Sequence, residues 1–129
     1  MMRYLPAALA ILLPFVDATS AGAQDAEKGE TVFKACRACH QVGEGAKNGV
    51  GPILNGIVGR KAGSIDGFNY SEANKEAGAG GLVWTEEKLF EYLEKPMVFM
   101  PKTKMAFVGV KDEGDRKDII AFLKTQAAK

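Results

Sequence analysis

Residues that bind metals or form disulfides are scarce in this chain. Its 129 residues include two cysteines, Cys36 and Cys39, and one histidine, His40. A structural zinc site needs four ligands, so these three side chains do not complete one. A thioredoxin-like pair requires a strand and a helix around its CxxC, and this region has no βαβ alternation or β-branched run. A disulfide between the two cysteines stays open at this point, although it leaves His40 unexplained.

An excess of charge of one sign is also absent. The chain has 17 basic and 16 acidic residues, which gives a net charge of +1. Without a basic excess or a basic patch interleaved with aromatic residues, the sequence lacks the electrostatic pattern typical of nucleic-acid binding. Repeats, low-complexity tracts and linkers are missing too, so we expect one small domain. A domain of this size buries a limited fraction of its surface, and an enclosed apolar group would supply much of its core.

Long apolar runs are lacking outside the N-terminal stretch. Residues 1–23 carry one early charge, Arg3, then an apolar run with two prolines, and they end in Ala21-Gly22-Ala23. The run is too short to cross ~30 Å of hydrocarbon comfortably, and the small residues form an A-x-A cleavage site. We therefore predict that residues 1–23 are a cleaved secretory signal, that residues 24–129 form the mature domain, and that the protein is periplasmic. A membrane-tethered form that keeps residues 1–23 is the alternative.

The hydrophobic periodicity favours helices. Two long segments between them have no helical or strand period, namely residues 41–83, which are rich in glycine, and residues 96–109. Gly29 lies on the apolar face of the first helix, which suggests close approach by another helix. The fold class is therefore all-α, with three principal helices and long loops. The predicted helices are residues 25–38, capped by Asp25; a short one at 71–77, capped by Ser71 and stopped by Gly78; 85–94, capped by Thr85 and ended by Pro96; and 115–126, packed on the first.

Both cysteines and the one histidine of the chain lie within a single five-residue motif, Cys36-Arg37-Ala38-Cys39-His40. Each thiol of a CxxCH sequence can add to a haem vinyl group to form a thioether, and the two intervening residues let both sulfurs reach one porphyrin edge. The histidine that follows can then bind the iron. The motif predicts one covalently attached haem c, with Cys36 and Cys39 as the attachment points and His40 as an iron ligand.

The second iron ligand is less obvious. Because His40 is the only histidine, a haem with two histidine ligands is excluded. The candidates outside residues 1–23 are the thioethers of Met97, Met100 and Met105. Methionines more often fill cores than bind metals, but this segment is predicted to be a loop, where an apolar side chain has less reason to be buried except against a cofactor. The residues alone leave all three candidates open.

With these features the sequence resembles the class I c-type cytochromes, and within them the bacterial cytochromes c2 and their mitochondrial relatives. The likeness covers nearly all of residues 24–129 and depends on motifs in a specific order. They are the CxxCH motif, Gly51-Pro52, Gly59-Arg60-Lys61-Ala62-Gly63, Gly67-Phe68-Asn69-Tyr70, residues 84–96, and Pro101-Lys102-Thr103-Lys104-Met105.

The resemblance implies roles for individual residues. It makes Met105 the second iron ligand and the Pro52 carbonyl the acceptor that orients the His40 ring. The other implied contacts to the haem or its surroundings are Arg60, Tyr70 and Trp84 at a buried propionate; Asn74, Tyr92 and Thr103 around the methionine sulfur and an inner water; and Phe107 at the haem edge.

The resemblance also implies a function. Such a protein is a one-electron carrier and not an enzyme, a monomer that passes electrons from a bc1-type complex to a terminal oxidase or a photosynthetic reaction centre. Several lysines of the mitochondrial relatives are replaced here, for example by Met97 and Val98, which weakens the expected docking face. An alternative from another class is a haem enzyme or gas sensor with an open sixth coordination position. The predicted docking residues are Lys34, Lys61, Lys102, Lys104 and Lys111.

Overall fold

The computed structural model describes residues 24–128, and the predicted signal lies outside them. Within these residues the only β pairing is an isolated antiparallel bridge between Lys61 and Val83, so the predicted all-α class is confirmed. None of the described helices combines the length and apolar character needed to cross a bilayer. The helices are α1 (Ala26–Phe33), the 3₁₀ turn η1 (Lys34–Cys36), α2 (Glu72–Ala79), α3 (Glu86–Glu94), α4 (Pro96–Phe99) and α5 (Glu113–Lys124).

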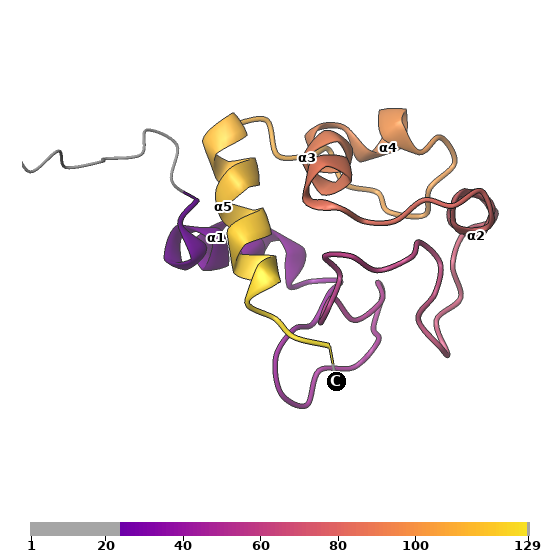
Figure 1. The fold of residues 1–129 in the computed structure, drawn as a ribbon, viewed down its shortest axis with the longest axis horizontal. Coiled ribbons are helices and arrows are strands. Elements are labelled where there is room, and N and C mark those ends of the chain that lie inside the picture. The colour runs from indigo at the N-terminus through magenta and orange to yellow at the C-terminus, as the bar shows by residue number, and fades with distance from the viewer. Residues whose placement is uncertain (1–23, 129) are drawn as a thin grey trace, which may run out of the picture.

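The first and last helices cross in direct contact (Figure 1). Asp25 caps α1 with its side chain, and its own N–H donates to Asp118 Oδ1 on α5 at 2.9 Å. Gly29 is buried at the crossing, where a Cβ atom would collide with the Asp118 carbonyl. One turn later the rings of Phe33 and Phe122 lie 5.3 Å apart between centroids. The prediction of close helix approach at Gly29 is confirmed.

The third helix ends as predicted, but the segment after it does not begin as a loop. Thr85 caps α3 by accepting from the Lys88 N–H, and the helix stops at Glu94, before Pro96. Pro96 then occupies the first position of α4, so the prediction that residues 96–109 lack a helix is wrong for their first turn. Proline suits this position because its φ is already helical and its missing N–H would have no partner there.

Other helix boundaries also differ from the predictions. The first helix tightens into η1 at Lys34 instead of continuing to residue 38. Gly78 does not stop α2, because it stays helical and packs against the Ala62 carbonyl, where a Cβ would clash. The last helix, predicted over residues 115–126, spans Glu113–Lys124. It begins earlier because the Asp112 carboxylate caps it by accepting from the Asp115 N–H at 2.8 Å.

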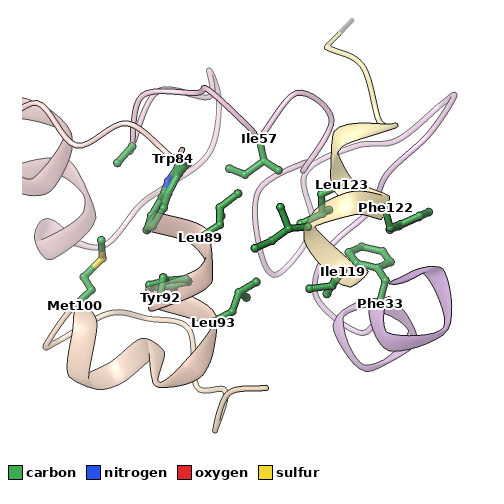
Figure 2. Close-up of a cluster of buried hydrophobic side chains, with 12 residues drawn as sticks. Phe33, Ile57, Trp84, Leu89, Tyr92, Leu93, Met100, Ile119, Phe122 and Leu123 are labelled. Carbon is green, nitrogen blue, oxygen red and sulfur yellow. The ribbon is translucent and has the colours of Figure 1, made fainter. Parts of the chain in front are cut away.

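The buried side chains form one cluster, which extends from α3 and α4 to α1 and α5 (Figure 2). One side of the cluster comes from α3 and from the residues that flank α3 and α4, and includes Tyr92 on α3, Trp84 before α3 and Met100 after α4. The other comes from α1 and α5, with Phe33 and Ile119 at its centre. Ile57 reaches the cluster from the glycine-rich loop, which is held in place by backbone hydrogen bonds such as Gly59 N–H to the Trp84 carbonyl, at 2.7 Å.

Candidate functional site

A cavity of about 380 Å³ lies within this fold. Apolar residues from α1, α3, α5 and the glycine-rich loop form much of its wall, including Phe33, Ile57, Leu89 and Ile119. The structure also brings all twelve predicted site residues to this wall, although they come from segments far apart in the sequence. These are Cys36, Cys39, His40, Pro52, Arg60, Tyr70, Asn74, Trp84, Tyr92, Thr103, Met105 and Phe107.

The CxxCH motif forms a tight turn that directs its three reactive side chains to the cavity. The Cys36 carbonyl accepts from the N–H of Cys39 at 3.1 Å and from that of His40 at 2.9 Å. Within the described residues neither cysteine is in a disulfide, so the Cys36–Cys39 disulfide that the sequence left open is not present. Burial raises the pKa of the Cys36 thiol, and Cys39 is exposed. The two sulfurs are therefore separate and available on the cavity wall.

The His40 ring is fixed in one orientation. Its Nδ1 lies 2.8 Å from the Pro52 carbonyl oxygen, and because a carbonyl only accepts, Nδ1 carries the proton. Burial lowers the pKa of His40, although the hydrogen bond to Pro52 opposes this. The ring also lies so close to Gly51 that a Cβ there would overlap it. A neutral ring held in this way leaves the Nε2 lone pair for a metal.

The three candidate methionines have different environments. Met105 is the one among them that lines the cavity. Met100 is 4% exposed and belongs to the core, while Met97 is 52% exposed on α4. Tyr92 Oη donates to Met105 Sδ at 3.1 Å, and burial raises the pKa of this hydroxyl, so it stays protonated as a donor. The Met105 N–H in turn donates to Thr103 Oγ1 at 3.2 Å.

Comparison with known proteins identifies what kind of site this is. The sequence profile of cytochrome c matches residues 26–127. The chain belongs to the cytochrome c family. Cytochrome c2 of Blastochloris viridis is 51% identical over 123 residues, which cover 95% of this chain and 93% of the relative. Cytochrome c2 of Rhodomicrobium vannielii is 56% identical over 109 residues, or 84% and 85% of the two chains. The solved structure of cytochrome c2 from Rhodospirillum centenum has a TM-score of 0.76 at 46% identity, over 81% of this chain and 99% of that one.

Membership of the cytochrome c family implies a covalently bound c-type haem, and the cavity fits one. Its donor set is two thiols, one imidazole and one thioether, with a large apolar wall. Asn74 Oδ1 is buried and has no hydrogen-bond partner within residues 24–128. A buried polar atom is rarely left unpaired, so this one indicates a polar group or water inside the filled cavity.

The residues predicted for a haem propionate also lie on the wall. Arg60 donates to the carbonyls of Ile53, at 2.9 Å, and of Asn55, at 2.5 Å. Tyr70 Oη accepts from the Ile65 N–H at 3.1 Å, which leaves its own proton for a further acceptor. A guanidinium and a free O–H on a half-buried wall suit a carboxylate.

Sequence reasoning missed Asn55, which supports the same wall. Its side chain forms two hydrogen bonds with the Gly43 backbone, accepting from the N–H at 2.7 Å and donating to the carbonyl at 2.9 Å. It is 5% exposed and its carbonyl is one of the two that hold Arg60. In sequence, an asparagine beside glycine indicates only a turn, so no signal pointed to this cross-link.

The five predicted docking lysines are all exposed, but they do not have equal surroundings. Lys104 Nζ lies 3.3 Å from the Asn69 carbonyl and 3.4 Å from that of Tyr70. Lys111 Nζ donates to the carbonyl of Val108 at 2.9 Å and to that of Glu94 at 3.3 Å. Within residues 24–128 the side chains of the other three form no hydrogen bond or ion pair: Lys34, Lys61 and Lys102.

Proposed function

We propose that this protein is a periplasmic one-electron carrier, with haem c attached through Cys36 and Cys39 and bound at iron by His40 and Met105. The haem supplies a reversible change between Fe(II) and Fe(III). The observation that carries the proposal is the position of Met105, which alone among the three candidate methionines lines the cavity that also receives the CxxCH turn.

The chain's own residues hold the two ligands still. Pro52 orients the His40 ring, while Tyr92 and Thr103 fix the Met105 side chain and backbone. With both ligands in place no coordination position is left for a substrate, which favours a carrier over an enzyme or gas sensor. The apolar wall excludes water and, together with a thioether ligand, raises the reduction potential.

The spectrum of the oxidised protein tests this ligand set. A bound thioether gives a sulfur-to-iron charge-transfer band in the near infrared, so we expect that band in the purified wild-type protein at neutral pH. Rapid CO binding to the reduced protein, without such a band in the oxidised one, would support the open-site alternative.

The export part of the proposal has its own test. It is supported by the A-x-A sequence and by the Blastochloris viridis match, which spans 95% of this chain and so extends into residues 1–23. We expect Gln24 to be the first residue of protein taken from the periplasmic fraction. Because an N-terminal glutamine can cyclise and block stepwise degradation, mass mapping of the N-terminal peptide is the suitable measurement. Recovery from membranes with residues 1–23 attached would support the tethered alternative.

For partners, we propose a bc1-type complex as donor and a terminal oxidase or photosynthetic reaction centre as acceptor, with docking through the lysines around the haem edge. Lys34, Lys61 and Lys102 are exposed, and within the described residues their side chains form no hydrogen bond or ion pair that would compete with a partner. Lys104 and Lys111 belong to the same predicted face, but their amines contact backbone carbonyls. The protein's net charge of only +1 means that any steering comes from this local face.

Salt dependence tests the docking face. Lys61→Glu should slow the second-order reduction by a purified bc1-type complex several-fold at low salt, and the difference should shrink once the Debye length falls to ~10 Å or less. The matched control is Lys28→Glu, which makes the same charge change at an exposed residue at the start of α1. Equal slowing by both substitutions would mean that total charge matters and that Lys61 is not part of a docking face.

A further inference from the structure

A tight turn connects the core of the protein to the segment that carries Met105. We call residues 100–105 the methionine strap. Its first residue, Met100, is buried in the hydrophobic cluster and follows the end of α4 (Figure 2). The Thr103 N–H donates to the Met100 carbonyl at 3.1 Å, and this hydrogen bond closes a turn over residues 100–103. The strap therefore begins in the core and reaches the cavity wall at Met105.

The turn requires an unusual backbone conformation at Lys102. Pro101 occupies the second position of the turn and Lys102 the third, where φ is 66°. Proline followed by a positive φ is the arrangement of a type II turn, which favours glycine at the third position. Eight glycines have a positive φ in residues 24–128, and Lys102 is the one residue of another type there that does. Lysine at this position therefore has a backbone conformation that its own side chain disfavours.

The Lys102 side chain makes no polar interaction that would offset this strain. It is exposed, and its amine forms no hydrogen bond or ion pair with any other described residue. A positive φ is costly for a residue with a Cβ atom, because the Cβ crowds the following carbonyl oxygen. Such a conformation persists only where the surrounding structure imposes it. The residues on either side of Lys102 must therefore hold it there.

Two anchors, one on each side, impose the conformation of Lys102. On the N-terminal side Met100 is fixed in the core, and the proline that follows it has a φ fixed by its ring. On the C-terminal side the Met105 sulfur accepts from Tyr92, and the Met105 N–H donates to Thr103 Oγ1 at 3.2 Å. Lys102 is the residue at which the chain turns between these anchors. Once Met105 is released, the turn can open and Lys102 can return to a negative φ.

We propose that Lys102 is a positioning residue that acts as a strained hinge, and that it makes Met105 easier to displace from the iron than glycine would. The strain is present while the strap is closed and is released when Met105 leaves, so it lowers the free energy of opening. The inference deepens the proposed function and rests on Met105 being the second ligand. Lys102 acts here through its backbone and not through its charge, so this role is separate from the docking role that the sequence predicts.

Three substitutions at this residue separate strain from charge. Lys102→Gly removes both, whereas Lys102→Ala removes the charge and keeps the strain, because alanine also has a Cβ atom. Lys102→Asn removes the charge and part of the strain, since asparagine tolerates the left-handed region better than most residues with a side chain. Because Lys102 is exposed, all three variants are expected to fold.

Imidazole binding to the oxidised protein measures how readily Met105 is displaced. Its binding is followed by loss of the sulfur-to-iron band, at neutral pH and fixed ionic strength. We expect Lys102→Gly to bind imidazole roughly three- to fivefold more weakly than wild type, since relief of strain outweighs the added flexibility of glycine. Flexibility alone would favour opening and tighten binding, so it cannot produce this result. Lys102→Ala should stay within about twofold of wild type, and Lys102→Asn should lie between the alanine and glycine variants.

Hydrogen exchange gives a second readout that does not depend on an added ligand. The amides of Thr103 and Met105 donate within the strap, and they should exchange more slowly in Lys102→Gly than in Lys102→Ala. Equal imidazole affinity and equal exchange in these two variants would overturn the hinge role alone. That holds even if the glycine variant is more stable in urea, because the strain would then be released only when the whole domain unfolds. A wild-type protein without the sulfur-to-iron band would overturn the ligand assignment, and the hinge with it.

Discussion

Met105→Ala is expected to lower the reduction potential by on the order of 0.2 V, within the roughly 0.8 V range that axial ligation controls. The thioether is a soft ligand that favours Fe(II), and alanine cannot replace it. The substitution also removes the sulfur that accepts from the Tyr92 hydroxyl, so this buried O–H can then donate only to water. The variant should lose the sulfur-to-iron band and bind CO rapidly in its reduced form. Potentiometry and CO-binding kinetics measure the two effects.

Substitutions of the other two methionines distinguish an effect on iron ligation from an effect on packing. Met97→Ala should change neither potential nor stability much, because Met97 is half exposed on α4. Met100→Ala should destabilise the fold by about 2–5 kcal/mol, as truncation of a buried methionine does, while keeping the band and the potential near wild type. If Met100→Ala abolishes the band and Met105→Ala keeps it, the ligand assignment is wrong.

The parts of the fold that could be predicted depend on short-range chemistry. Asp25, Ser71 and Thr85 were identified as caps from their side chains, and each accepts the backbone N–H bonds expected of a cap. The errors occurred where tertiary contacts decided the outcome. Gly78 continues α2 because it faces the Ala62 carbonyl, a contact between residues 16 apart in sequence. The single turn of α4 is too short to produce a hydrophobic period.

For the functional site, the sequence alone predicts the haem attachment motif but not the second iron ligand. Spacing alone predicts a CxxCH haem motif, because the covalent chemistry sets that spacing. It could not choose among Met97, Met100 and Met105, since the choice depends on which of them lies on the cavity wall and which in the core. The resemblance named Met105, and the same resemblance treated Lys104 as a surface charge. Its contacts with Asn69 and Tyr70 join segments whose proximity no local pattern reveals.

The crossing of α1 and α5 leads to the second large effect, on stability. In an exposed helix, replacing glycine by alanine stabilises by about 1 kcal/mol. At Gly29 we expect the opposite sign, because the new Cβ would collide with the Asp118 carbonyl and also approach Phe122. Overpacking of a close contact costs about 1–3 kcal/mol, and the obstacle here is backbone, which cannot rotate away. Gly29→Ala should therefore be less stable than wild type by about 1–3 kcal/mol, and Gly29→Val by more.

The measurement is the free energy of unfolding of the haem-loaded protein in urea, together with the melting temperature. For a domain of this size, each kcal/mol lost should lower the melting temperature by roughly 4–8 °C. Gly80→Ala is the matched control, since Gly80 caps α2 at a φ of −78° and a Cβ there meets its neighbours at ordinary contact distance. Alanine at that position should be neutral or slightly stabilising, because it restricts the unfolded chain. If Gly29→Ala instead equals or exceeds wild type in stability, α1 and α5 do not approach as closely as this crossing requires. Their contact would then not be the rigid frame on which the CxxCH turn, directly after α1, is held.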